Sequence, residues 1–124
     1  MNIKQLKKKA AEARKLMVET LILSGCGHPG GAFSCVDMLV YLYFHILNID
    51  PKNPKNLDRD IFILSKGHSS IALYSVLALR GFFDVEILKT FRQDNSILGG
   101  HPDMNKVPGV EMSTGSLGQG LSVG

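Results

Sequence analysis

The chain has 124 residues, of which 44% are hydrophobic and 20% charged, and its formal net charge is +3. This length suits one domain or a piece of one, and the composition excludes a disordered or fibrous protein. Because the longest strongly apolar stretch, residues 38–44, is far shorter than the roughly 20 residues of a membrane span, and no secretory signal is visible, we expect a cytoplasmic protein without a membrane partner.

The first predicted element is an amphipathic helix over residues 3–23. Its apolar side chains recur at spacings of three and four, which is the spacing of one helix face. This face comprises Ile3, Leu6, Ala10, Ala13, Leu16, Met17 and Leu21. The segment is rich in lysine, but its first twenty residues contain no aromatic side chain. A solvated helix face is therefore favoured over a nucleic-acid interface.

A loop and a second helix are predicted next. Residues 24–31 contain four glycines and one proline, which make continued helix unfavourable. Ser34 then predicts the cap of a helix that reaches about residue 47, and Asp37 in its first turn complements the helix dipole. The only cysteines, Cys26 and Cys35, match neither a redox motif nor a paired zinc motif, so free thiols are expected.

The middle of the chain predicts a strand, a turn and a helix. Residues 50–56 are rich in proline and polar turn formers, which predicts a surface crossing. The β-rich run 61–64 predicts a short buried strand, and residues 71–80 predict a helix that ends at Gly81. This order is typical of a parallel α/β architecture. Because one strand cannot form a sheet, we expect the neighbouring strands to lie beyond Gly124.

The last part of the chain predicts little regular structure. Asp84 predicts the cap of a short helix that runs to about Arg92, and residues 93–115 show little periodicity and many turn formers. Irregular segments of this length tend to be functional in compact domains. The glycine turn 115–120 is similar to a phosphate-binding turn at a helix start. It lacks the lysine of a P-loop, however, and a plain glycine-rich connection accounts equally well for its spacing.

Three of the four histidines share an unusual setting, because His28, His68 and His101 each follow a glycine and precede a proline or a serine. Glycine lets the backbone approach a ligand closely, and histidine donates, accepts or carries a proton near neutral pH. Three idle turn histidines are one alternative. A zinc site is another, although gaps of 40 and 33 residues give no ligand spacing. His45, beside Tyr41 in the second predicted helix, is expected to be packed or half-buried.

These motifs together resemble the transketolase family. The resemblance rests on four segments in the same order and at similar gaps, and it covers nearly the whole chain. They are Gly27-His28-Pro29-Gly30-Gly31, Leu64-Ser65-Lys66-Gly67-His68, Gly100-His101-Pro102 and Thr114-Gly115-Ser116-Leu117-Gly118-Gln119-Gly120. Ser34-Cys35 and the lysine-rich start look most like the amino-terminal subunit of split transketolases, whose second half is a separate polypeptide.

The resemblance implies an α/β fold, the thiamine diphosphate-binding fold, in which helices cover both faces of a parallel sheet. Residues 1–124 would be an incomplete, helix-rich amino-terminal part of the diphosphate-binding domain. The implied activity is the transfer of a two-carbon ketol unit from a ketose phosphate to an aldose phosphate, in the pentose phosphate pathway. It would require thiamine diphosphate and a divalent metal, magnesium or calcium.

The resemblance also implies roles for particular residues. His28 and His101 would contact donor and acceptor oxygens and assist proton movement, and His68 would lie near the diphosphate and the substrate channel. Leu117 would help to hold the bent shape of the cofactor. The implied catalytic residues are thus His28, His68 and His101, and the implied cofactor contacts are His68, Gly115, Ser116 and Leu117.

One family feature is absent from this chain. In transketolases a Gly-Asp-Gly followed by an asparagine binds the metal, so the domain is expected to be truncated before its metal motif and to supply no metal ligand. The glutamate that activates the cofactor belongs to a later domain. We therefore expect the chain to be inactive alone and to act in a homo- or hetero-oligomer, such as a dimer, with a complementary carboxyl-terminal half. The alternative is a non-catalytic binding or regulatory module that pairs with a full subunit.

Overall fold

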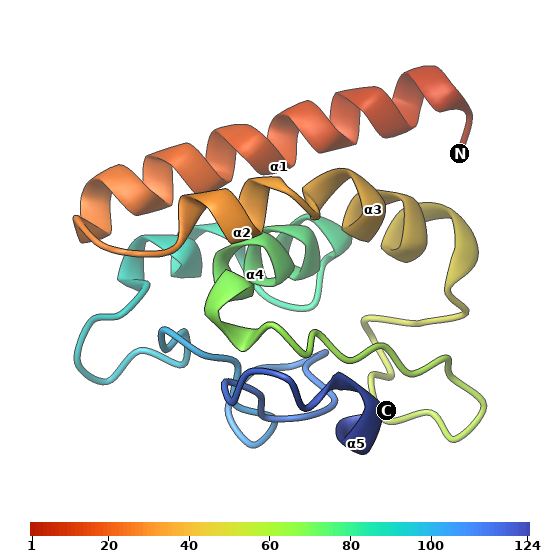
Figure 1. The fold of residues 1–124 in the computed structure, drawn as a ribbon. Helices are drawn as coiled ribbons and strands as arrows, with labels where there is room; N and C mark the ends of the chain where they lie inside the picture. The colour runs from red at the N-terminus through yellow and green to blue at the C-terminus, as the bar shows by residue number, and fades with distance from the viewer.

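Helix α1 (Ile3–Ser24) crosses one side of the molecule, as its apolar spacing predicts (Figure 1). The computed structural model describes all residues from 1 to 124. The helix begins with a capping box in which Asn2 and Gln5 exchange hydrogen bonds, and it ends at Gly25 in the left-handed conformation. Its buried residues are Ala10, Ala13, Met17 and Thr20.

The second predicted helix is divided in the structure. It consists of α2 (Pro29–Phe33), α3 (Val36–Tyr41) and a π-helical turn, η1 (Leu42–Ile46). The predicted loop over 24–31 therefore ends early. Pro29 opens α2 because the first helical position needs no N–H donor.

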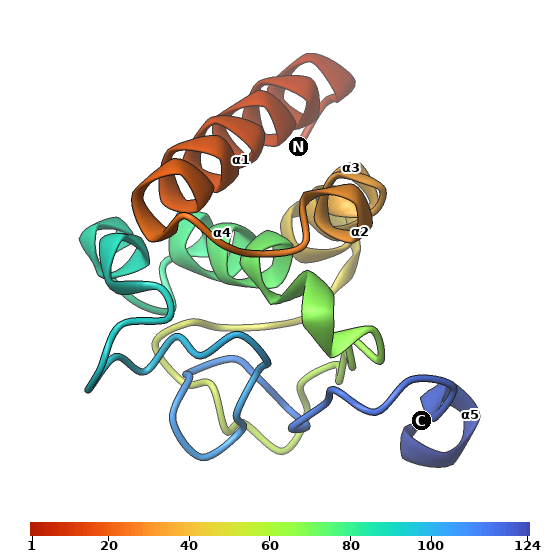
Figure 2. The same ribbon diagram turned by 60° about the vertical axis from the view of Figure 1, so that its left-hand side comes forward.

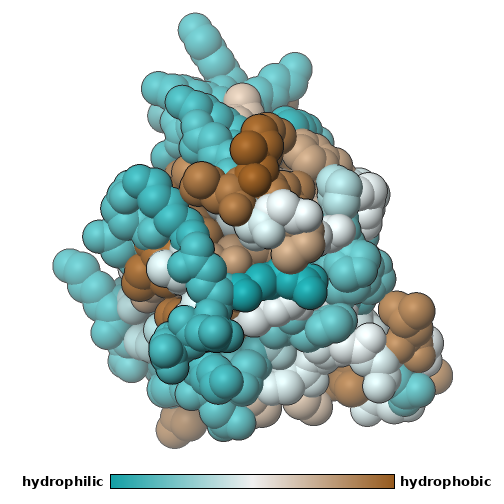
Figure 3. Space-filling model, turned by 90° about the vertical axis from the view of Figure 1, so that its left-hand side faces the viewer, coloured by the Kyte–Doolittle hydropathy of each residue, from teal (hydrophilic) through white to brown (hydrophobic).

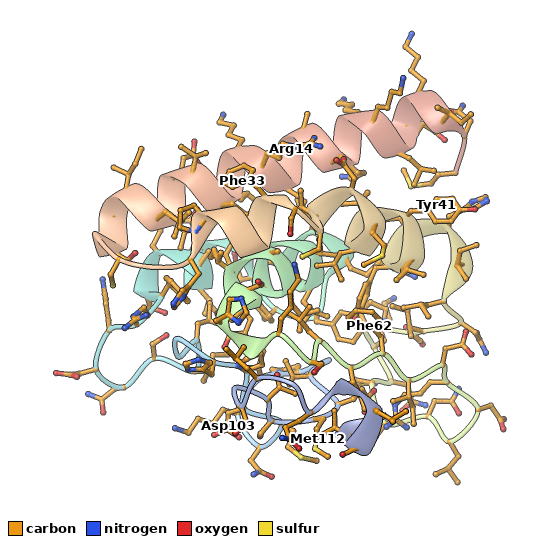
Figure 4. The ribbon with its side chains drawn as sticks, viewed as in Figure 1. Arg14, Phe33, Tyr41, Phe62, Asp103 and Met112 are labelled. Atoms are coloured by element: carbon orange, nitrogen blue, oxygen red, sulfur yellow. The ribbon has the colours of Figure 1, made fainter.

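Ser34 does not cap a helix, contrary to the sequence-based expectation. It follows α2, and its hydroxyl donates to the carbonyl oxygen of Gly31 at 2.8 Å, while Cys35 precedes the first turn of α3. Asp37 does lie in that first turn, and it forms an ion pair with Arg14 of α1, the residue labelled on that helix in Figure 4. This contact holds α3 against α1.

Helix α4 (Ser70–Arg80) lies at the centre of the fold, where it packs against α1 and α3 (Figures 1 and 2). A 3₁₀ turn, η2 (Gly67–Ser69), leads into it, and Gly81 ends it with φ 98°. Every side chain from Ser70 to Ala78 is buried. A helix that is apolar on nearly all sides is typical of such a central position, so the prediction for residues 71–80 is confirmed.

The segment after α4 is mostly irregular, as predicted. Asp84 accepts a hydrogen bond from the Glu86 amide and caps η3 (Val85–Thr90), a 3₁₀ helix. Residues 91–119 form turns, bends and irregular coil, and a last turn of helix, α5 (Gly120–Val123), follows them. Five apolar side chains anchor these loops to the core beneath α4: Leu88, Phe91, Leu98, Val107 and Val110.

The predicted strand over 61–64 is not a strand in the structure. No backbone–backbone hydrogen bond joins these residues to another segment. Ile61 is 63% exposed, and Leu64 is the only buried residue of the four. A strand needs a neighbouring strand for its ladder. The parallel sheet of the predicted fold class is therefore not seen in this chain, which is helical with long loops.

Apolar side chains also remain at the surface at both ends of the helical layer. Val18, Ile22 and Leu23 are exposed near the carboxyl end of α1, and Figure 3 shows hydrophobic atoms on that side of the molecule. At the opposite end, Tyr41 points outward from α3 (Figure 4). None of the helices is both long and apolar enough to span a membrane.

Candidate functional site

His28 and His68 lie next to each other although 40 residues separate them in sequence. Their ring centroids are 5.4 Å apart and the rings meet edge to face, at 72°. His28 immediately precedes α2 and is exposed, whereas His68 lies in η2 and is half-buried. The turn before α2 and the turn before α4 therefore bring two of the three predicted histidines together.

Gly31 makes this approach of the two turns possible. A Cβ atom at this position would lie 2.6 Å from the Ser69 hydroxyl oxygen and 3.1 Å from Nε2 of His68. A larger residue would therefore displace the side chains of Ser69 and His68. The other ring nitrogen of His68, Nδ1, is buried without a hydrogen-bond partner, and such an orphaned polar atom is costly unless it serves a ligand.

His101 meets the other part of the predicted site, the glycine turn that begins at Gly115. A Cβ at Gly115 would lie 3.2 Å from Cδ2 of the His101 ring, so the ring rests directly against this backbone. A Cβ at Gly67 would lie 2.4 Å from the Thr114 carbonyl oxygen, and the Thr114 hydroxyl donates to the Leu64 carbonyl oxygen at 2.7 Å. The turn that carries His68 and the loop that carries Thr114 and Gly115 are thus in contact.

A polar cleft of about 480 Å³ opens beside these contacts. Its walls contain one apolar side chain among seven residues: Ser65, Ser113, Thr114, Gly115, Ser116, Gln119 and Val123. The structure thus brings Gly115 and Ser116 to one cleft. Leu117 does not line it and is 72% exposed, so this side chain contacts little of the chain itself.

Lys66 is a further polar residue of this region, to which the sequence analysis assigned no role of its own. Its ammonium group donates to the Gly31 carbonyl oxygen at 2.7 Å and to the Ser34 hydroxyl at 2.8 Å, and it has no carboxylate partner within 4.0 Å. It therefore leaves an uncompensated positive charge beside His68. Its place directly before Gly67 and His68 was the only signal in the sequence.

The fourth histidine is separate from this group. His45 lies beside Tyr41, as expected, with ring centroids 5.3 Å apart, and its Nδ1 is 3.3 Å from the amino-terminal nitrogen. It is exposed, so the expectation of a packed or half-buried ring was wrong. The reason is that η1 turns this ring toward the start of the chain and away from α4.

The zinc alternative finds no support in the structure. Nowhere in the chain do three or more histidine, cysteine, aspartate or glutamate side chains gather as metal ligands would. His28 pairs with His68, and His101 instead packs against Gly115. The histidines thus surround the glycine turns and do not converge on one ion.

Comparison with known proteins shows the family of the chain. Residues 6–124 match the family described as transketolase, thiamine diphosphate binding domain. The chain is 45% identical, over 117 residues, to a 6-deoxy-6-sulfo-D-fructose transketolase subunit of Clostridium sp. strain MSTE9; the match covers 94% of this chain and 42% of that relative. It is 44% identical over 124 residues to one subunit of the apulose-4-phosphate transketolase of Phocaeicola vulgatus, and this match covers all of the chain and 44% of the relative.

Comparison with solved structures also finds a transketolase. The crystal structure of transketolase from Campylobacter jejuni superimposes with a TM-score of 0.88 at 43% identity, over 98% of this chain and 19% of that one. The family match and the fold thus define part of a thiamine diphosphate-binding domain. The chain belongs to the transketolase family. It spans less than half the length of the two curated relatives.

Proposed function

We propose that the protein containing this chain transfers a two-carbon ketol unit from a ketose phosphate to an aldose phosphate, with thiamine diphosphate as cofactor. The observation that carries this proposal is the contact between the turn of His68, which pairs with His28, and the loop of Thr114 and Gly115, which packs against His101 and lines a polar cleft. The family match supports it, as do the names of the two relatives, which refer to a sulfo-fructose and to apulose 4-phosphate.

The residues present fit a cofactor of this kind. The cleft volume of about 480 Å³ lies in the usual range of small-molecule sites, roughly 300–1,000 Å³. Gly67 brings the turn of His68 against Thr114 of the cleft wall, and His68 offers a buried nitrogen that has no partner in the chain. When bound, thiamine diphosphate supplies the electron sink for the carbanion chemistry. We assign its binding to His68, Gly115, Ser116 and Leu117.

His28 and His101 take the substrate side of the proposed site. Both rings are exposed and therefore free to contact sugar oxygens, and imidazole exchanges protons readily near neutral pH. His28 and His101 would hold donor and acceptor oxygens and move protons at them. The positive charge of Lys66 favours an anionic ligand in the same region.

The metal ligands, the rest of the active site and the partner strands are proposed to come from residues outside these 124. The chain contains no Gly-Asp-Gly motif, so a magnesium or calcium ion would be held by residues outside it. A complementary carboxyl-terminal half or subunit would complete the site, and further strands would pair with residues 61–64 to form the parallel sheet. We propose a cytoplasmic dimer or higher oligomer that works in the pentose phosphate pathway.

The test compares the 124-residue chain with a version extended through the metal motif. Calorimetric titration with thiamine diphosphate and magnesium is expected to show binding only to the extended version. The complete protein with its partner is expected to convert a ketose phosphate and an aldose phosphate, and the isolated chain to show no turnover. Absence of ketol transfer by the complete protein, over a panel of phosphorylated and sulfonated ketoses, would refute the proposal.

A non-catalytic module that pairs with a full subunit is the second candidate. The observation that favours it is the exposure of Met38, Tyr41 and Ile46 along α3 and η1. Co-purification and size-exclusion chromatography separate the two candidates. A stable complex with a full subunit that adds no activity would favour the module, whereas cofactor-dependent turnover that requires both chains would favour the enzyme.

A further inference from the structure

Helix α4 contacts the backbone of the His101 loop through two hydroxyl groups. The Tyr74 hydroxyl lies 2.9 Å from the Gly99 carbonyl oxygen and 3.1 Å from that of His101. Because a tyrosine hydroxyl has one hydrogen, the two carbonyls share it. One turn earlier, the Ser70 hydroxyl donates to the Gly100 carbonyl oxygen at 2.9 Å. Three consecutive carbonyl groups are thus held by a single helix.

The donor side of these contacts is buried, whereas Gly99 and His101 are exposed. Tyr74 and Ser70 are both 0% exposed, and the Tyr74 ring packs edge-on against Phe91 with centroids 6.1 Å apart. Burial raises the pKa of Tyr74, so its hydroxyl stays a donor throughout the working pH range. Loss of this donor removes the hydrogen bonds that hold the Gly99 and His101 carbonyl groups against α4.

The loop has few other restraints near His101. Residues 91–119 have no regular secondary structure, and the backbone amides of residues 99–101 make no backbone hydrogen bond. Asp103 follows in the same loop, which lies below α4 in Figure 4. The position of the His101 ring against Gly115 therefore depends on how the three carbonyl groups are held.

His68 lies in the η2 turn that leads directly into the same helix, because α4 begins at Ser70. We propose that Tyr74 and Ser70 are positioning residues, which fix the His101 loop relative to His68 and so set the geometry between the substrate and cofactor sides of the site. This inference rests on the proposed ketol transfer. It assigns no contact with substrate to either hydroxyl.

The test uses the complete protein, with its partner, and the variant Tyr74→Phe, which removes only the hydroxyl. We expect kcat/KM for the ketose donor to fall about tenfold, the effect of losing roughly one hydrogen bond, while the Kd of thiamine diphosphate changes less than about twofold. Backbone order parameters of Gly100 and His101, from nuclear magnetic resonance relaxation, should fall from about 0.85 toward 0.6. Ser70→Ala should act in the same direction.

Tyr43→Phe is the matched control. Tyr43 is also a buried tyrosine, but its hydroxyl makes no hydrogen bond with the His101 loop, so its loss should leave the order parameters and kcat/KM unchanged. Equal behaviour of Tyr74→Phe and Tyr43→Phe in both measurements would overturn the inference. If Tyr74→Phe does not fold, Ser70→Ala decides the question by the same two measurements. If the wild-type protein transfers no ketol unit, the proposed function fails, but the order parameters still test the positioning role.

Discussion

At the scale of single residues, the surroundings of the exposed histidines distinguish their proposed roles. His28, His45 and His101 are all exposed, but only His28 and His101 lie against other parts of the proposed site. An exposed side chain contributes little to folding, so its position is free to serve a ligand. His45 thereby provides an internal control for the chemistry of the other two.

We expect His101→Ala to lower kcat of the complete protein by on the order of a hundredfold or more, the usual effect of removing a group that moves protons. The thermal midpoint should stay within a few degrees because the ring is exposed. His45→Ala should change neither quantity. Steady-state kinetics and thermal melting of the three proteins check this, and an unchanged kcat in His101→Ala would contradict the role assigned to this ring.

Gly67→Ala tests the contact between the two glycine turns. The added Cβ would lie 2.4 Å from the Thr114 carbonyl oxygen, which is backbone and cannot move aside without its loop. We expect a loss of about 1–3 kcal/mol of stability, the typical result of overpacking, and a weaker Kd for thiamine diphosphate. In Gly30→Ala the new Cβ meets nothing within 4 Å, so this variant should melt like the wild type. Denaturant unfolding and calorimetry measure the two effects.

At the scale of elements, loops far apart in the chain are joined by ionic contacts. Arg59 and Glu111 form a two-pronged pair, with both N–O distances 2.7 Å and side-chain exposures of only 16% and 12%. Such paired geometry is the strongest arrangement for these groups. Because Glu111 lies three residues before Thr114, the pair ties the loop of the proposed cofactor contacts to the segment before residues 61–64.

Glu111→Gln should lower the thermal midpoint by several degrees at neutral pH, since it keeps the shape but removes the charge. The Arg59 hydrogen bond, which outweighs burial, lowers the pKa of Glu111. A carboxylate with a lowered folded-state pKa stabilises the fold above its unfolded pKa, about 4.3, and this contribution disappears as the pH falls through the folded pKa. The stability difference between wild type and variant should therefore shrink below about pH 4.3. Melting curves measured from neutral pH down into this acidic range check this, and a constant difference would argue against the ion pair.

The whole molecule consists of a layer of helices packed on a layer of loops (Figure 1). Residues 61–64 pass between the two layers and pair with no neighbouring strand. Their amides lack backbone acceptors, whereas those of α4 lie in a buried helix. Hydrogen exchange should therefore be fast at 61–64 and slow in α4 for the isolated chain. In the complete protein, protection at 61–64 should rise, because the proposed sheet would pair these amides. Fast exchange there in both forms would contradict the sheet.

The sequence alone predicted α1, α4 with its end at Gly81, the irregular character of residues 93–115, and the family. These features are encoded locally, by apolar spacing, by glycine and proline, and by short motifs. Helix hydrogen bonds close within four residues, so the nearby sequence is sufficient to predict them.

Only the tertiary structure decided the role of Ser34, the pairing of Arg59 with Glu111, and the contacts of Tyr74 with the His101 loop. Ser34 is 32 residues from Lys66, Arg59 is 52 residues from Glu111, and Tyr74 is 27 residues from His101. No local pattern encodes which partner such a side chain meets. The prediction of a strand over 61–64 was wrong for the same reason. The apolar run is a local feature, but the hydrogen bonds of a strand require a neighbouring strand, and none lies beside these residues in the chain. The sequence thus proposes a set of site residues, whereas the geometry of the loops that carry them arises from packing around α4.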